Sequence, residues 1–268
     1  DIENYTVEDL RRWYAMWYAP NNATLVVAGD VNGAEVVAMA ERFFGPLKPS
    51  RLEPPKPRRE VKQLGPREVV VRVPAEIPYL LMGFPVPTVA TAEEAWEPYA
   101  LEVMAYVLDG GKSARLNKNL IRGAKVVTSA GVGYVPYDRL QTLLLLDGVP
   151  VAGQSVETVK QALLGELKEM KRQPVTSSEL ERVKAQVVAA KVFEQDSVFY
   201  QAMQMGTLET IGLDWREVDR YAENIRKVTA AQVLAVANKY LDLNRMTTAI
   251  LEPLPIEREE KGGDAHES

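Results

Sequence analysis

Cysteine is missing from this 268-residue chain, and histidine occurs once, as His266. Because structural and catalytic zinc sites usually need at least two His or Cys ligands, these residues cannot complete such a site alone. A Ser-His-Asp or Cys-His catalytic set would have to use His266, which lies in a polar tail typical of solvated residues. We therefore expect no catalytic residue, no metal ligand and no bound zinc within residues 1–268.

An excess of positive charge is also missing, as is any long apolar run. Lys and Arg number 32 against 37 Asp and Glu, and this net charge of −5 argues against a nucleic-acid partner. The apolar run 140–149 is much shorter than the roughly 20 residues of a membrane span. The chain opens at Asp1 in helix-like sequence, with neither Met nor a signal peptide, so we expect a fragment or a processed product.

What the chain does contain is a pattern that occurs twice, at an offset of 223 residues. Thr6 can cap a helix with an apolar stripe, and residues 23–29 form a short β-rich run. Near the other end, Thr229 opens a capping box and a second striped helix, followed by a strand over 246–251. If the pattern is a true repeat, the chain holds the end of one unit and a complete second unit.

Composition places the boundaries between these units. We expect residues 1–47 to be the C-terminal end of a first unit, with a helix from about Gly33 to Phe44. Residues 48–66 are proline-rich and predict an extended, semi-rigid linker. Residues 67–253 form the second unit, and residues 254–268 a polar tail without fixed structure.

The second unit is predicted to have an α+β fold. Strands are expected early, helices later, and one strand returns at the end, which suggests a mixed or antiparallel sheet with helices on one face, a two-layer sandwich. Two of the strands should form a hairpin with a four-residue turn at 136–139. The expected strands are 68–73, 79–85, 126–135, 140–149 and 246–251, and the expected helices begin at Pro98, Ser113, Ser155, Thr176, Asp214 and Thr229, with a further helix through Met203.

Three short motifs have ordinary structural explanations. Gly110 to Ser113 resembles the end of a phosphate-binding loop, but the loop's first glycine is replaced by Tyr106, so a helix end followed by a helix start explains it better. Gly131 and Gly133 suggest a bulge or a close backbone approach within a strand. Apolar residues at helical spacing are expected in the core, namely Phe193, Phe199, Tyr200, Met203 and Met205.

Several segments together resemble the pitrilysin/insulinase family of zinc metallopeptidases, and most of all its bacterial two-unit members. The resemblance covers residues 1–253. It rests on Thr6 to Leu10, Trp17 to Val31, Phe43 to Leu47, Leu108 to Leu116 and Leu120 to Arg122.

The resemblance implies homologous units of about 220 residues, each a sheet with helices on one face, which close around a substrate chamber. The family's zinc site is an inverted H-x-x-E-H motif with a distant glutamate, and the matching region would lie before Asp1. This chain would then be the C-terminal portion of a zinc-dependent metalloendopeptidase, forming chamber wall and substrate contacts. The alternative is a non-catalytic structural or assembly paralogue of the same family.

The resemblance also implies substrate contacts. Many members have in this unit an arginine and, seven residues later, a tyrosine near the substrate. Arg122 matches the arginine, whereas Ser129 occupies the tyrosine position. Tyr134 could replace the tyrosine only by a register shift, and Arg115 matches a position that packs the helix. An exposed helix-end charge is the alternative explanation for Arg122.

Partners and location follow from the resemblance alone. The expected partners are peptide substrates, the missing N-terminal unit and a homo- or heterodimer partner. Zinc is expected in the parent protein, and the expected compartment is the bacterial periplasm.

Overall fold

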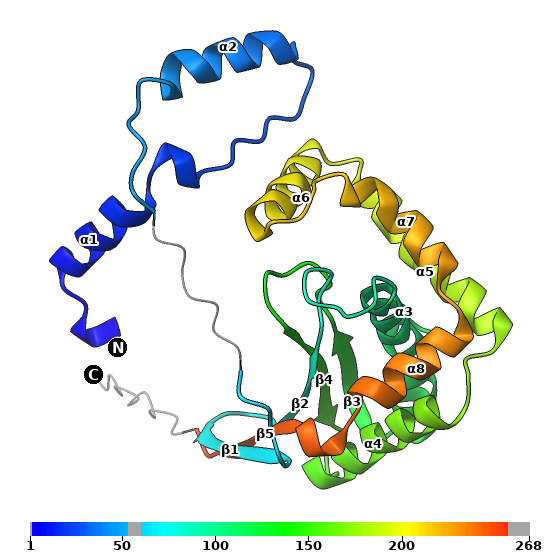
Figure 1. Ribbon diagram of the computed structural model, residues 1–268. Coiled ribbons are helices and arrows are strands. Elements are labelled where there is room, and N and C mark those ends of the chain that lie inside the picture. Colours follow the sequence, from blue (N-terminus) through cyan, green and yellow to red (C-terminus); the bar gives the residue numbers. More distant parts are fainter. Residues whose placement is uncertain (1, 53–59, 257–268) are drawn as a thin grey trace, which may run out of the picture. The chain divides into compact units, whose positions relative to one another are not determined.

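The computed structural model describes residues 2–52 and 60–256 (Figure 1). The chain divides into two compact units. One comprises residues 1–62 and 190–221, and the other comprises residues 63–189 and 222–268. His266 and most of the predicted tail lie outside the described residues, as does the centre of the predicted linker.

The second unit is built on a five-stranded mixed sheet, as the sequence predicts. The strand order is β1-β5-β2-β4-β3. β1 pairs with β5 in parallel, and every other neighbouring pair is antiparallel. The strands are β1 (Arg67–Pro74), β2 (Tyr79–Val86), β3 (Val127–Gly133), β4 (Thr142–Pro150) and β5 (Thr247–Leu254).

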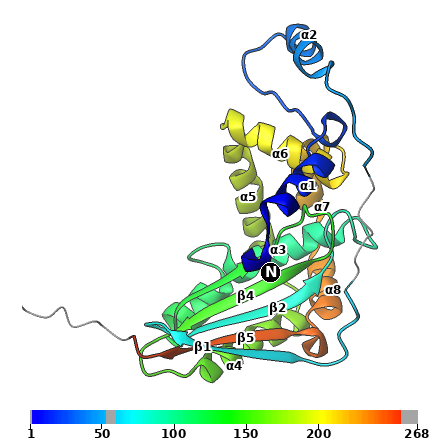
Figure 2. The ribbon, with the colours of Figure 1, turned by 90° about the vertical axis from the view of Figure 1, so that its left-hand side faces the viewer.

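Three helices cover one face of this sheet (Figures 1 and 2). They are α3 (Glu97–Asp109), α4 (Val156–Arg172) and α8 (Ala230–Tyr240). Even-numbered residues of β2 and β4 point toward them and are buried, such as Met82 and Leu146. A side chain at Gly148 would meet Val159 of α4 at 2.7 Å, so helix and strand approach closely there. This confirms the predicted two-layer α+β arrangement.

The predicted hairpin of β3 and β4 forms, but its turn is longer than four residues. β3 ends at Gly133 and β4 begins at Thr142, so residues 134–141 connect them, and the β3–β4 ladder itself ends at Gly133 opposite Leu145. The Tyr134 hydroxyl donates to the Pro87 carbonyl at 2.7 Å, and the Val89 N–H donates to the Pro136 carbonyl at 2.8 Å. These bonds tie the loop to the segment after β2 and prevent the ladder from continuing.

The first unit contains helices α1 (Val7–Trp17) and α2 (Gly33–Phe44), both where the sequence predicts them. Residues 23–29 were expected as a strand, and this prediction is wrong for the structure as described. Strand structure requires a neighbouring chain to accept and donate backbone hydrogen bonds, and no described strand pairs with this run. Aromatic residues of the same unit are strongly exposed, including Trp13 and Phe43.

The two repeats of the sequence pattern form matching local structure. α1 begins and ends 223 residues before α8, and the 3₁₀ turn Pro20–Asn22 lies 223 residues before Leu243–Arg245. Thr6 and Thr229 each form a complete capping box, with Asp9 and Gln232 respectively. The local structure is therefore repeated, although only the second copy continues into a strand.

Helix α5 (Ser177–Glu194) is followed by α6 (Val198–Ile211) and α7 (Glu217–Lys227). The prediction that the apolar residues of this region lie in the core is wrong for Phe193, Phe199 and Met203, whereas Tyr200 and Met205 are half-buried. Phe193 and Phe199 are 73% and 76% exposed, and Met203 is 43% exposed. Helical spacing showed that these residues share faces, but it could not show whether another element covers them.

Candidate functional site

The residue predicted to contact substrate, Arg122, lies in a short π-helical segment, η3 (Asn117–Gly123), which follows α3 in the chain. Such segments are rare and often occur at functional sites. The Arg122 side chain is exposed, and its NH2 group donates to the Lys112 carbonyl at 2.5 Å. The guanidinium therefore holds the loop between α3 and η3, while its surface is open to solvent.

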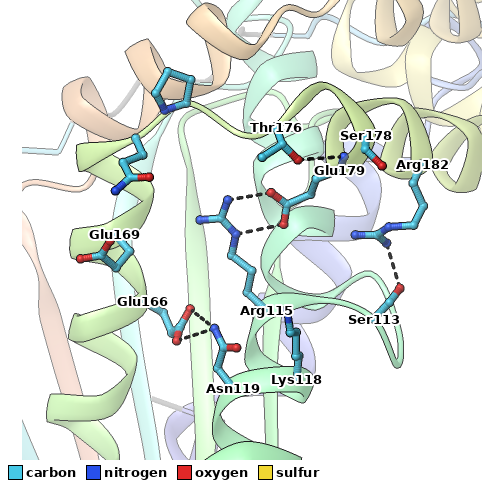
Figure 3. Close-up of a pocket in the computed structure, with 12 residues that line it drawn as sticks. Ser113, Arg115, Lys118, Asn119, Glu166, Glu169, Thr176, Ser178, Glu179 and Arg182 are labelled. Carbon is cyan, nitrogen blue, oxygen red and sulfur yellow. Dashed lines mark hydrogen bonds and ion pairs between the residues drawn. The ribbon is translucent and has the colours of Figure 1, made fainter.

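A polar pocket of about 510 Å³ separates η3 from helices α4 and α5 (Figure 3). Across it, Arg115 forms a two-bond ion pair with Glu179 (2.7 and 3.0 Å), and this pair raises the pKa of Arg115. Asn119 donates to both carboxylate oxygens of Glu166 at 2.9 and 3.0 Å. These bonds join the segment that contains Arg115 and Asn119 to α4 and α5. The Arg115 guanidinium is thus bound within the protein, by the carboxylate of Glu179.

Glu179 has a partner outside its own helix end. Thr176, where the sequence predicts that a helix begins, accepts the Glu179 N–H at 3.2 Å, which is one half of a capping box. The second half is missing because the Glu179 carboxylate binds Arg115. The side chain at this position joins α5 to η3 rather than closing its own helix end.

Ser129, at the family's tyrosine position, lies on β3, the edge strand next to η3. Its side chain is exposed. The strand is irregular just before it, where the register shifts between Val127 and Ser129. Such a bulge re-aims the side chains that follow it.

Tyr134 does not take the place of that tyrosine. Its hydroxyl donates to the Pro87 carbonyl, and burial raises the pKa of the phenol well above its usual range. It anchors the hairpin loop.

A second pocket, of about 450 Å³, lies between α3 and the end of β3. Two carboxylates line it, those of Glu102 and Asp109. Burial raises the pKa of Asp109, the Val132 N–H that it accepts at 3.1 Å lowers it, and the nearby Asp147 raises it. The rest of the lining is Ala105, Tyr106, Gly110, Gly111, Val132, Gly133 and Tyr134.

Gly131 explains how Asp109 and Asp147 come together. A Cβ there would meet Asp147 Oδ1 at 2.7 Å and Asp109 Oδ2 at 3.5 Å, so a larger residue would displace the Asp147 carboxylate from its present position. Asp147 also bonds the Tyr79 hydroxyl; burial raises the pKa of that phenol, and the Asp147 charge and hydrogen bond raise it further. The predicted close backbone approach at Gly131 is therefore an approach to acidic side chains.

Sequence reasoning missed this acidic group, which consists of Glu102, Asp109 and Asp147. The available signal was Gly131, because a glycine within a strand marks a place where another group comes close. Which groups approach was not readable, since Asp109 and Asp147 come from different elements, the end of α3 and β4.

The donor chemistry does not fit a zinc site in the described part of the chain. Among residues 2–52 and 60–256, no group of three or more His, Cys, Asp or Glu side chains could hold a metal ion. The helices in these ranges also lack the combination of length and hydropathy that a membrane span requires.

Comparisons with known proteins show which family this chain resembles. A family model described as the peptidase M16 inactive domain matches residues 4–187. Zinc protease PqqE of Helicobacter pylori is 24% identical over 257 residues, which cover 94% of this chain and 56% of that protein.

Solved structures show the same fold. A protease from Helicobacter pylori has a TM-score of 0.86 at 23% identity, covering 94% of this chain and 60% of the other. The first half of the periplasmic protease PqqL from Escherichia coli has a TM-score of 0.74 at 15% identity, covering 92% and 55%. The chain thus spans a little over half of each of these relatives. Because the family model matches more than half of the residues, this chain belongs to the peptidase M16 family, through its inactive domain.

Proposed function

We propose that residues 1–268 are the C-terminal portion of a zinc-dependent metalloendopeptidase, in which they form chamber wall and substrate contacts. The zinc site would belong to an N-terminal unit with the H-x-x-E-H motif. The observation that carries the proposal is the uncovered face of the second unit's sheet.

That face presents a mixed surface suited to an unfolded peptide. Odd-numbered residues of the strands point to it, opposite the helices. They include Val69 and Val71 on β1, Leu143 on β4, and the Tyr79 and Asp147 pair. No helix of the unit, in its described part, packs there. Apolar patches with polar groups at intervals contact extended chains without demanding one sequence.

The second pocket, which lies beside the end of β3, would contact the substrate backbone and one positively charged group of the substrate. β3 is an edge strand, and an extended peptide can lie against such an edge. The carboxylates of Glu102 and Asp109 would then face a cation, either the peptide's amino terminus or a basic side chain. Burial raises the pKa of Asp109, and a cation in the pocket would counteract this by favouring the ionised carboxylate.

The first unit has an open groove and an unpaired extended run, which an additional, upstream segment would cover in our proposal. Its α1 and α2 border a groove of about 1040 Å³ lined by Trp13, Trp17 and Phe44. In the second unit the equivalent helix α8 packs on α3 and α4, and its following strand lies inside a sheet. The upstream part of the first unit would cover the groove and pair with residues 23–29.

The experiment that tests the proposal compares residues 1–268 with a longer protein that also includes an upstream unit, so that its length matches that of the relatives. We expect the extended protein to hold about one zinc ion and to cleave unfolded peptides, and residues 1–268 to do neither. Metal analysis after dialysis and a fluorogenic peptide assay read both outcomes. Zinc retained by residues 1–268 would contradict the proposal, and an extended protein without zinc or activity would favour the non-catalytic paralogue.

Substrate contact by Arg122 is tested in the extended protein. Arg122→Ala should lower peptide turnover and leave the melting temperature nearly unchanged, whereas Arg115→Ala should lower the melting temperature, because it leaves Glu179 half-buried and unpaired. If Arg122→Ala lowers the melting temperature and leaves turnover intact, its bond to Lys112 is its role.

Two further parts of the proposal concern location and assembly. The periplasm is the proposed compartment, since the matching Escherichia coli protease PqqL is described as periplasmic. A second subunit, identical or related, would complete the chamber.

A further inference from the structure

The outer edge of β1 is an unpaired strand with a self-complementary sequence. β1 ends the sheet on one side, and within the described residues no strand pairs with its outer edge. Four valines follow one another closely here, and Val69 is 51% exposed. Val70 is 38% exposed although it is on the helix-covered face. Exposed apolar edge strands readily pair with another chain.

The backbone bonds to β5 determine which groups β1 presents outward. The Arg67 N–H donates to the Met246 carbonyl at 3.0 Å, and the Ala75 N–H donates to the Leu254 carbonyl at 3.3 Å. Because backbone groups alternate in direction along a strand, odd-numbered residues bond β5. Glu68, Val70 and Arg72 therefore direct their N–H and C=O groups to the open edge.

We propose that β1 pairs antiparallel with β1 of a second copy of this chain, about a two-fold axis at Val70. In that register Val70 faces Val70 of the second copy, and Glu68 faces Arg72 of the second copy, twice by symmetry. All three residues carry outward N–H and C=O groups, so each facing pair exchanges two backbone hydrogen bonds. On the uncovered face, Val69 faces Val71 of the second copy, which extends the apolar surface across the axis.

Neighbouring registers lack this match. A two-fold axis at Val71 keeps the hydrogen-bond phase but sets Glu68 opposite Pro74, and an axis at Val69 sets Glu68 opposite Val70. The ends of the strand also agree with the axis at Val70. Pro66 would face Pro74 of the second copy, and since proline has no N–H, the ladder stops there on both sides.

The charged residues of this pairing already have partners within the chain that hold them in place. Lys160 binds Glu68 at 2.7 Å, and Arg72 binds Glu252 at 2.7 Å. In the dimer the Lys160–Glu68 pair of one copy would meet the Arg72–Glu252 pair of the other. On the helix side, Lys160, Glu68, Arg72 and Glu252 would then form a row of alternating charges, twice by symmetry. At the other end of the sheet, the edge strand β3 differs from β1 because its Val132 N–H is already bound by Asp109.

Sedimentation of residues 1–268 across a range of concentrations tests the proposal. We expect a reversible dimer. Val70→Pro removes the central outward N–H groups while leaving the bonds to β5, and it should raise the dimer Kd at least about tenfold. Val70→Thr keeps those groups and serves as the control, with a dimer Kd close to that of the original chain.

Charge reversal tests the register itself. E68R and R72E should each be monomeric, since each sets like charges opposite one another. An equimolar mixture should dimerise, because both basic side chains of the E68R chain then face the two acidic side chains of the R72E chain. Circular dichroism and urea unfolding check that each variant is folded.

Three results would overturn the proposal. The first is a monomer at every concentration, which would favour an upstream strand as the partner of β1. The second is a dimer that Val70→Pro leaves intact, which would place the contact on another surface. The third is a mixture of E68R and R72E that stays monomeric while the original chain dimerises.

Discussion

Helices α1 and α8 begin with the same capping box, have the same length and lead into the same 3₁₀ turn, yet their surroundings differ. Val236 of α8 is fully buried, whereas Trp13, its equivalent in α1 at an offset of 223, is 56% exposed. The run after α8 becomes β5, and the run after α1 pairs with no described strand. Local sequence therefore suffices for the cap, the helix and the turn, while burial and strand pairing depend on neighbours.

The largest effect should come from placing a charge at the two equivalent helix positions. Val236→Asp puts an unpaired carboxylate among α3 and α4 side chains and should cost about 3–5 kcal/mol of unfolding free energy. Trp13→Asp should cost less than about 0.5 kcal/mol, because its site is open to solvent. Urea unfolding followed by circular dichroism measures both. Equal losses would mean that α1 is packed as α8 is.

A smaller effect on stability is expected from a substitution at the last residue of α8, for which α1 has no titrating equivalent. The Tyr240 hydroxyl donates at 2.9 Å to Glu97, which is buried, and burial together with this bond raises the pKa of Tyr240 to about 12. A raised folded pKa stabilises the protein below the unfolded value of about 10, and the contribution is lost as pH rises from there to 12. Tyr240→Phe should cost about 1 kcal/mol at pH 7.

The pH dependence is the sharper readout for this pair. In Tyr240→Phe the loss of stability between pH 10 and 12 should be shallower than in the original chain, as measured by urea unfolding at each pH. The equivalent residue of α1 is Trp17, which does not titrate, and Trp17→Phe should leave the slope unchanged. Parallel slopes for Tyr240→Phe and the original chain would contradict the account.

The smallest effect should come from the two caps. Thr229→Ala removes the side-chain acceptor of a packed helix and should cost about 0.5 kcal/mol of unfolding free energy. Thr6→Ala removes the same bond from α1 and should reduce helix content there without changing the unfolding of the second unit. Amide exchange at α1 and at α8 distinguishes these results. A loss of α8 protection in Thr6→Ala would contradict the independence of the two caps.

The sequence predicts best where structure is local. The helix with Thr6 as its cap, the helix over 33–44 and the strand beginning at Tyr79 all form as expected. The failures involve distant partners. Residues 23–29 have the composition of a strand, but strand structure needs a second chain segment.

The same limit applies to the candidate site. Glu179 has the position of a capping-box residue, yet its carboxylate binds Arg115, 64 residues away. Arg122 and Ser129 could be located only through a family resemblance, and their contact with a substrate stays a prediction. The acidic group near Gly131 joins residues of α3 and β4, which lie far apart in the sequence, so the sequence held only the glycine as a sign of it.

Hydrogen exchange of residues 1–268 tests the central claim most directly, that the chain holds one complete unit and the end of another. The account predicts strong protection of the β5 amides at 247–251 and rapid exchange of their counterparts at 24–28, with protection of 24–28 once an upstream unit is present. Equal protection of both runs in residues 1–268 alone would contradict it.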